Sequence, residues 1–378
     1  MCLPRICKLH APQRAVSMLT IEASTKNNNF NLARLILASS VILSHTYEAT
    51  IGKTDADFFS PYLGEKISYF AVDGFFFLSG FLVYASLIRR QSAVAFFSAR
   101  LARIWPGLIA SIVLVVLIGS LFTNVPLHDY LRGETKGFML KNALFLGGSY
   151  SLTGVNCEGA LCNINGSLWT IPWEIGCYAL LTIIFLAGLS KKELMSRVIF
   201  PATIAFVLAW HWQPFGITDQ SSLGYNFARI DRLWTVFALG IAAYIYKDKI
   251  KLSWTILLVL LGLTVLQNRL GIHAHIESLF AGYLLLCLGF LTVKDEAFSA
   301  HWHDYSYGMY IYAFPVMTLL QQAFHFTNPW ALAAANFFCT LPVAALSWHL
   351  VEKPMVALAA RWTAGFQKAQ PLQPSPAT

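Results

Sequence analysis

Four ionisable side chains interrupt long apolar stretches of this sequence, and their types could support acid–base chemistry. Arg34 and His45 share the first apolar stretch, Asp73 lies in the second, and Glu174 lies in a later one. A charge inside a membrane-spanning helix is costly unless it is paired or hydrated, so each of these residues is a functional candidate. A carboxylate beside a histidine holds the imidazole in one tautomer and raises its basicity, which a general base needs.

Arg34 and His45 are predicted to face the same way on one helix. Their eleven-residue separation corresponds, at about 100° per residue, to three turns plus about 20°. The distance between them along the helix axis is about 16 Å. Arg34 should lie near the cytoplasmic end and His45 near the outer end. Taken singly, Arg34 could extend to the interface and His45 could cap the helix.

Asp73 and Glu174 are predicted to lie at roughly the depth of His45. Each falls in the outer part of a helix that runs inward, and Pro172 removes a backbone hydrogen bond just before Glu174. We therefore predict that Asp73 or Glu174 orients His45, which acts as the catalytic base. The alternative is an ion pair that only holds the three helices together.

A second group of polar residues should gather at the cytoplasmic face. Arg100 and Arg103 are three residues apart and so share one helix face, where two guanidinium groups can hold a phosphate. The alternative is that both are ordinary basic anchors at the membrane surface. The ends of the last two helices add hydroxyls and a carboxylate at the same level: Ser306, Tyr307, Tyr310 and Glu352. Tyrosine is common at interfaces, and Glu352 could simply pair with a neighbouring Lys or Arg.

The composition indicates a polytopic membrane protein of the all-α class. Of the 378 residues, 56% are hydrophobic and only 12% are charged, whereas a soluble domain carries about a quarter charged residues. A disordered chain, a disulfide scaffold and a soluble enzyme are therefore excluded. The net charge of +8 does not indicate nucleic acid, because Lys and Arg of an apolar chain concentrate on cytoplasmic loops. Membrane lipids are the expected surroundings.

About ten transmembrane helices are predicted, because a helix needs about 20 mostly apolar residues to cross the hydrocarbon. The candidate stretches are Phe30–Thr46, Ile67–Ile88, Ile104–Phe122, Ser167–Leu189, Val198–Trp212, Ile230–Tyr246, Trp254–Leu270, Ile276–Val293, Tyr305–Phe326 and Trp330–Val351. A long outer loop, residues 123–166, separates the third from the fourth. Its Phe138–Leu146 stretch is too short to span, so we expect an interfacial or re-entrant segment.

Both termini are predicted to be cytoplasmic. Most of the 27 Lys and Arg residues fall on one set of alternate loops, together with the two ends of the chain. We expect residues 1–29 to form a polar N-terminal tail, residues 30–360 the membrane domain and residues 361–378 a C-terminal tail.

Cys157 and Cys162 lie together in the outer loop, where the compartment should be oxidising. They could form a local disulfide or remain two free thiols. The sequence leaves both possibilities open.

No metal site is predicted. Two His-x-His pairs, His273/His275 and His301/His303, fall on opposite sides of the predicted membrane, so they cannot form one four-ligand site. No Cys-x-x-Cys sequence accompanies them.

Six segments resemble, in the same order, the acyltransferase-3 family of membrane O-acyltransferases. The segments are the Arg34 and His45 pair, Val72–Phe81, Arg100–Arg103, Trp169–Glu174, Ser306–Tyr310 and Glu352–Pro354. Each is weak alone, and the six in register are specific. The chain departs from many members at Ala313, where they carry a histidine. No appended esterase-like domain is expected, so the membrane domain would act alone or with a separate partner.

The resemblance implies an O-acetyltransferase of a bacterial inner membrane that modifies a cell-envelope or exported carbohydrate. The donor would be an acyl-CoA, most often acetyl-CoA, which is a co-substrate and not a bound cofactor. The arginine cluster would bind the CoA phosphates. His45 would deprotonate the acceptor hydroxyl or carry the acyl group transiently.

A transporter or flippase for lipid-linked saccharides is the rival interpretation, because it also needs charges inside many helices. Secondary transporters often contain internal repeats with paired broken helices. The sequence contains neither, which favours the enzyme.

Overall fold

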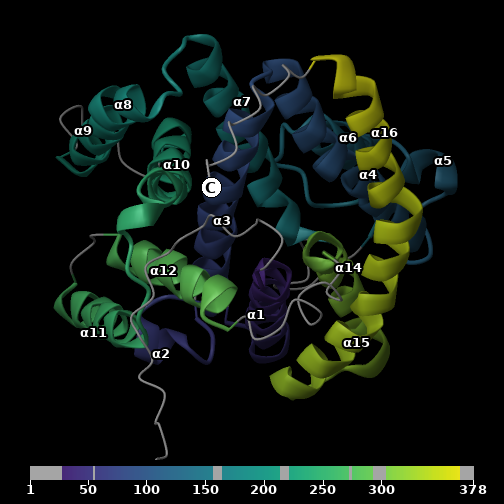
Figure 1. Cartoon of the computed structure of the whole chain (residues 1–378). Coiled ribbons are helices and arrows are strands. Elements are labelled where there is room, and N and C mark those ends of the chain that lie inside the picture. Colours follow the sequence, from purple (N-terminus) through teal and green to yellow (C-terminus); the bar gives the residue numbers. More distant parts are fainter. Residues whose placement is uncertain are drawn as a thin grey trace, which may run out of the picture.

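Helices make up the regular secondary structure of the described chain, as the all-α prediction requires (Figure 1). The structure is a computed structural model, and it describes residues 28–53, 56–155, 164–212, 221–271, 275–292 and 304–366. The helices are α1 (Phe30–Ile51), α2 (Ser60–Leu63), α3 (Ile67–Arg90), α4 (Ala93–Gly119), α5 (Leu127–Tyr130), α6 (Gly133–Ala143), α7 (Ile171–Leu186), α8 (Lys192–Leu194), α9 (Phe200–Trp212), α10 (Ser222–Ile245), α11 (Trp254–Leu270), α12 (Ile276–Phe290), α14 (Ser306–Phe324), α15 (Pro329–Ser347) and α16 (Lys353–Thr363).

Five helical stretches of the described chain are long and apolar enough to cross a membrane. They are Ile67–Arg90, Ala93–Gly119, Gly166–Leu186, Lys192–Trp212 and Pro329–Phe366. Helices α11 and α12 are apolar but shorter. These stretches support a multi-pass membrane protein, while the number ten and the orientation of the termini stay predictions. Large apolar side chains such as Leu117, Ile183 and Leu208 are exposed on the outer helices, as contact with lipid requires.

Helix α3 lies at the centre of the bundle, with α10 and α12 on one side and α4 on the other (Figure 1). It is the most deeply buried of the five membrane-length stretches. Its crossing with α10 is a direct backbone contact. A Cβ atom added at Gly80 would lie 2.0 Å from the carbonyl oxygen of Phe237, and one added at Gly240 would lie 2.0 Å from that of Phe77. Small residues let membrane helices approach this closely.

Helix α4 begins earlier than the apolar stretch from Ile104 predicts. Ser92 caps the helix by accepting a hydrogen bond from the amide of Ala95. Arg100 and Arg103 therefore lie inside α4 and not ahead of it. Hydropathy misses these first turns because the two basic residues interrupt the apolar run.

The last predicted span does not end at Val351. A π-helical turn, Trp348–Glu352, connects α15 directly to α16, and helical structure continues to Phe366. Pro354 lies in the first turn of α16, where its missing N–H costs little. The wider turn rotates the helix so that Glu352 is fully buried.

The long loop predicted between the third and fourth spans contains two short helices, α5 and α6. Helix α6 packs against α4, and Trp105 donates a hydrogen bond to the carbonyl of Ala143 at 3.0 Å. Phe138 is fully buried there. Cys157 and Cys162 lie outside the described residues, so their pairing stays open.

We predict that Gly80→Ala destabilises the protein by about 2–3 kcal/mol, because the new methyl group forces α3 and α10 apart. The measurement is thermal unfolding of the purified protein in detergent, followed by Trp fluorescence. Gly262→Ala is the matched control, since a Cβ atom at this α11 position meets no atom within 4 Å. Equal melting temperatures for the two variants would contradict the close crossing.

Candidate active site

A cavity of about 120 Å³ lies between α1, α3, α4, α7 and the start of α14. Its polar lining consists of Arg34, Ser79, Arg100, Arg103, Thr170, Glu174, Tyr178, Asp304, Ser306, Tyr307 and Tyr310. Six of the seven residues predicted to bind the donor are among them, from three different helices: Arg34, Arg100, Arg103, Ser306, Tyr307 and Tyr310. The seventh, Glu352, does not line the cavity. The structure thus brings these six together around one space, as predicted. Their role toward a ligand is a separate question.

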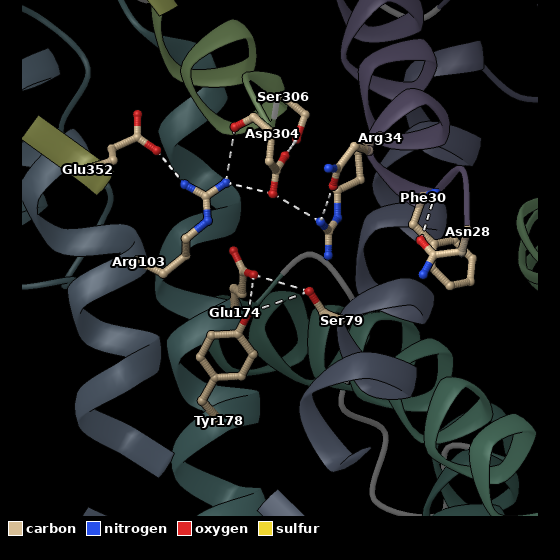
Figure 2. A network of polar contacts seen from close by, with 11 residues as sticks. Asn28, Phe30, Arg34, Ser79, Arg103, Glu174, Tyr178, Asp304, Ser306 and Glu352 are labelled. Atoms are coloured by element: carbon tan, nitrogen blue, oxygen red, sulfur yellow. Dashed lines mark hydrogen bonds and ion pairs between the residues drawn. The ribbon is translucent and has the colours of Figure 1, made fainter. Parts of the chain in front are cut away.

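Asp304 connects the arginine side chains across this cavity (Figure 2). One of its carboxylate oxygens lies 3.0 Å from Arg34 and 2.8 Å from Arg103. The hydroxyl of Ser306 donates to the other oxygen at 2.5 Å. Burial by itself would raise the pKa of the Asp304 carboxyl, but Arg103 and Arg34 outweigh burial and hold this pKa well below its usual range. Asp304 is therefore ionised at any working pH.

Glu352 lies behind Arg103, outside the cavity lining. It accepts a hydrogen bond from Arg103 and another, at 3.0 Å, from the hydroxyl of Ser347. The guanidinium of Arg103 also stacks on the ring of Trp348, 4.8 Å from its centroid. Glu352 thus positions Arg103 and compensates its charge, and the alternative pairing with Lys353 or Arg361 is not observed.

Arg100 differs from the other two arginines of the cavity. Within the described part of the chain, no carboxylate forms an ion pair with it, and its buried Nε atom has no hydrogen-bond partner. It lies one helical turn before Arg103 on α4 and lines the same cavity. An unpaired guanidinium in a cavity within apolar helices is suited to hold an anionic ligand.

Glu174 lies in the cavity but not beside His45. Its carboxylate accepts hydrogen bonds from Tyr178 and, at 3.3 Å, from Ser79 (Figure 2). Pro172 occupies the first turn of α7, where no helical hydrogen bond is lost, and a short 3-10 turn precedes it. The prediction that Glu174 orients His45 is therefore wrong, because α7 directs this carboxylate toward the arginine cavity.

Asp73 does not contact His45 either. It accepts hydrogen bonds from Arg232 of α10 at 2.9 Å and from Ser278 of α12 at 2.8 Å. Asp73 is buried, so these partners compensate its charge inside the bundle. The predicted pairing with His45 is wrong: Asp73 ties α3 to α10 and α12.

The carboxylate beside His45 belongs to Glu48, one turn further along α1. The Nδ1 atom of His45 lies 3.0 Å from Glu48, which also binds the ammonium group of Lys66. The imidazole packs edge-on against Phe314, with the ring centroids 5.2 Å apart. A carboxylate at Nδ1 selects the tautomer that carries its proton there, which leaves Nε2 as an acceptor. A carboxylate thus orients His45 as predicted for a base, but this carboxylate belongs to Glu48 and not to Asp73 or Glu174.

His45 lines a second, smaller cavity that adjoins the first at Tyr310. Ser167, Phe314 and Asn336 are among its other walls, and Tyr310 lines both cavities. The hydroxyl of Tyr310 lies 2.9 Å from that of Thr170, and its ring packs edge-on against Phe75. Arg34 and His45, both on α1, therefore line two neighbouring cavities that share the side chain of Tyr310.

Sequence reasoning missed Asp304 and Glu48. Local signals existed for both, since Glu48 follows His45 at a spacing that shares a helix face, and Asp304 precedes the serine that begins α14. Both lie at the margins of apolar stretches, where acidic residues are expected without any function.

Comparison with known proteins agrees with this architecture. A family described as an acyltransferase domain matches residues 27–349. The chain belongs to this family, as its motifs predicted, and it is an acyltransferase.

Two characterised relatives cover nearly the whole chain. An O-acetyl transferase of Shigella phage Sf6 is 26% identical over 347 residues, which are 87% of this chain and 96% of the relative. Nodulation protein 10 of Rhizobium leguminosarum bv. viciae is 26% identical over 370 residues, which are 89% of this chain and 95% of that protein. No solved structure matches the chain significantly.

We predict that Asp304→Asn destabilises the protein by about 3 kcal/mol, because it leaves Arg34 and Arg103 without their shared counter-charge. The folded-state pKa of Asp304 is depressed, so its contribution is fully present above about pH 4 and the loss should be the same at pH 6 and pH 8. Thermal unfolding of both proteins in detergent at pH 6 and at pH 8 measures this loss of stability. Asp129→Asn replaces an exposed carboxylate that pairs with the exposed His128, and it should change stability by less than about 0.5 kcal/mol. A melting temperature of Asp304→Asn equal to that of this control would contradict the bridging role.

Proposed function

We propose that the protein transfers an acetyl group from acetyl-CoA to a hydroxyl of a cell-envelope or exported carbohydrate, in the inner membrane of a bacterium. Family membership supports acyl transfer, and the name of the phage relative supports acetyl transfer to oxygen. The resemblance of the motifs implies the CoA donor and the carbohydrate acceptor. The observation that carries the proposal is Arg100, an unpaired guanidinium among hydroxyls in a cavity that adjoins the His45–Glu48 pair.

The arginine cavity provides the donors that a nucleotide phosphate needs. Arg100 supplies the uncompensated positive charge, while Asp304 and Glu352 hold Arg34 and Arg103 in place. A phosphate on Arg100 would restore charge balance inside the bundle, which makes binding of an anion favourable. The CoA phosphates are suitable anions, and hydroxyls of the cavity can add hydrogen bonds.

The thioester has to reach from this cavity to His45. Arg34 and His45 are about 16 Å apart along the axis of α1, and a pantetheine arm is of comparable length. Tyr310 stands between the two cavities. We infer that the arm passes this side chain, which separates the nucleotide from the reacting carbonyl.

At His45 the proposed reaction is base-assisted attack on the thioester. The Nε2 atom accepts the proton of the sugar hydroxyl while the hydroxyl oxygen bonds to the carbonyl carbon of the acetyl group. The bond between that carbon and the CoA sulfur then breaks. The proton on His45 passes to the departing CoA sulfur. Glu48 stabilises the imidazolium that forms, and Lys66 holds Glu48.

Transient acetylation of His45 itself would use the same Nε2 atom. Acid-quenched protein analysed by mass spectrometry separates the two routes, because only this one leaves an acetyl group on the peptide that contains His45.

We predict that His45→Ala lowers the turnover number by about 10²–10⁴-fold, since the base is removed, and that Glu48→Gln lowers it by about 10²-fold. The assay is consumption of labelled acetyl-CoA by purified protein in the presence of crude envelope glycans. His128→Ala is the control, because this exposed histidine lies outside both cavities and pairs with the exposed Asp129.

Turnover by His45→Ala within a few-fold of the control would remove the proposed base. Failure of the wild-type protein to consume acetyl-CoA would overturn acetyl transfer as a whole, and flippase activity would then be the interpretation to test.

We predict that Arg100→Ala raises the KM for acetyl-CoA at least tenfold, because a charge-assisted contact to phosphate is worth about 1.5–3 kcal/mol. Arg89→Ala removes an exposed charge from the neighbouring helix end and should leave the KM unchanged. The measurement is the acetyl-CoA dependence of the initial rate at fixed glycan concentration. Equal KM values for the two variants would show that Arg100 does not bind the donor.

A further inference from the structure

Three side chains that could ligate a metal come together from α9, α10 and the residue before α12. These three helices lie on the opposite side of the bundle from α15 and α16 (Figure 1). His211 comes from the end of α9, Asp231 from α10, and His275 from the residue before α12. One donor atom from each lies within 4.8 Å of the others. The Nε2 atom of His275 is 3.4 Å from Asp231, and the two imidazole centroids are 5.9 Å apart. None of the three lines the arginine cavity.

The cluster contains a buried carboxylate oxygen without a hydrogen-bond partner. The side chain of Asp231 is only 7% exposed, and among the described residues its Oδ1 atom and the Nε2 atom of His275 have no hydrogen-bond partner. Arg232 follows Asp231 in the sequence but binds Asp73 instead. A buried carboxylate with an unfilled acceptor position is costly, and a cation between these atoms would remove that cost.

The hydrogen bond of His211 leaves a nitrogen available to a metal. Its Nδ1 atom lies 2.9 Å from the carbonyl oxygen of Val207. A carbonyl can only accept, so Nδ1 carries the proton and Nε2 keeps its lone pair. Metal-ligating histidines almost always donate their second nitrogen to such an oxygen.

The backbone of His275 adopts an uncommon conformation. Its φ angle is +51°, in the left-handed region that few residues other than glycine adopt. Strained backbone of this kind concentrates at functional sites. Here it places the imidazole beside Asp231, directly before α12 begins.

We propose that His211, Asp231 and His275 bind one Zn²⁺ ion, with water in the fourth position. Two imidazole nitrogens and one carboxylate oxygen are a donor set that suits zinc, and three protein ligands are typical of an open zinc site. The prediction that there is no metal site rested on the two His-x-His pairs and did not include His211 or Asp231. Of those four histidines, His273, His301 and His303 lie outside the described residues.

The ion would attach α9 to the rest of the bundle. Helix α9 has no buried side chain of its own and packs mainly on α10. Zinc would add a link from α9 to α10 and α12, the two helices that Asp73 already connects to α3. This role is structural and does not depend on the proposed acetyl transfer.

The test uses full-length protein in detergent, purified with a tag free of histidine and stripped of metal by a chelator. Titration with Co²⁺, which reports four-coordinate sites by its visible absorption, should show one ion per chain that Zn²⁺ displaces. His211→Ala and Asp231→Asn should each weaken binding at least ~100-fold, since even loss of a group that only supports a ligand costs 10–100-fold. His128→Ala is the control, as an exposed histidine elsewhere, and should bind like the wild type.

Zinc should also raise the melting temperature of the wild type and of His128→Ala but not that of His211→Ala. Because His211 is exposed, its replacement leaves the fold intact and keeps the comparison valid. Binding of one Co²⁺ per chain by His211→Ala with unchanged affinity would overturn the proposal, as would absence of binding to the stripped wild type.

Discussion

Three guanidinium groups enclosed among apolar helices impose the main constraint on this protein, because each needs a counter-charge that water cannot replace. Asp304 supplies the counter-charge for Arg34 and Arg103, from which it lies 3.0 and 2.8 Å away. Glu352 forms a second ion pair with Arg103. The bridge joins α1, α4 and the start of α14, so the walls of the cavity are set by the same contacts that neutralise its charge. Among the described residues, Arg100 has no carboxylate partner, which is why the proposed function assigns the anionic donor to it.

Each buried carboxylate near the site has a separate task. Glu48 orients His45, Glu174 faces the arginine cavity through Tyr178 and Ser79, and Asp73 holds α3 to α10 and α12. This division keeps His45 apart from the guanidinium groups, which line the other cavity. Tyr310 marks the boundary between the two environments. A donor that spans this boundary can be held by charge at one end and react at the other.

The helical frame explains why these side chains keep their positions. Helices α3 and α10 are in direct backbone contact at Gly80 and Gly240. The hydrogen bond between Asp73 and Arg232 adds a polar contact between the same two helices. At the other side, the π-helical turn between α15 and α16 directs Glu352 inward behind Arg103. In this chain, irregular helix geometry thus occurs where a buried carboxylate has to meet Arg103.

The sequence by itself determined the helical membrane class, the family, and the gathering of Arg34, Arg100, Arg103, Ser306, Tyr307 and Tyr310 around one space. Hydropathy and helical spacing are local properties, so they need no knowledge of distant partners. Only the tertiary structure decided which carboxylate serves which cation. The prediction that Asp73 and Glu174 lie at the depth of His45 is wrong. The α3 residue that bonds to α1 beside His45 is Ser68, through Ser44, and Glu174 lies with Arg34 in the arginine cavity. Hydropathy does not determine how far the helices slide or rotate against each other, and packing sets both. Asp304 and Arg34 lie 270 residues apart, and no periodicity in the sequence could pair them.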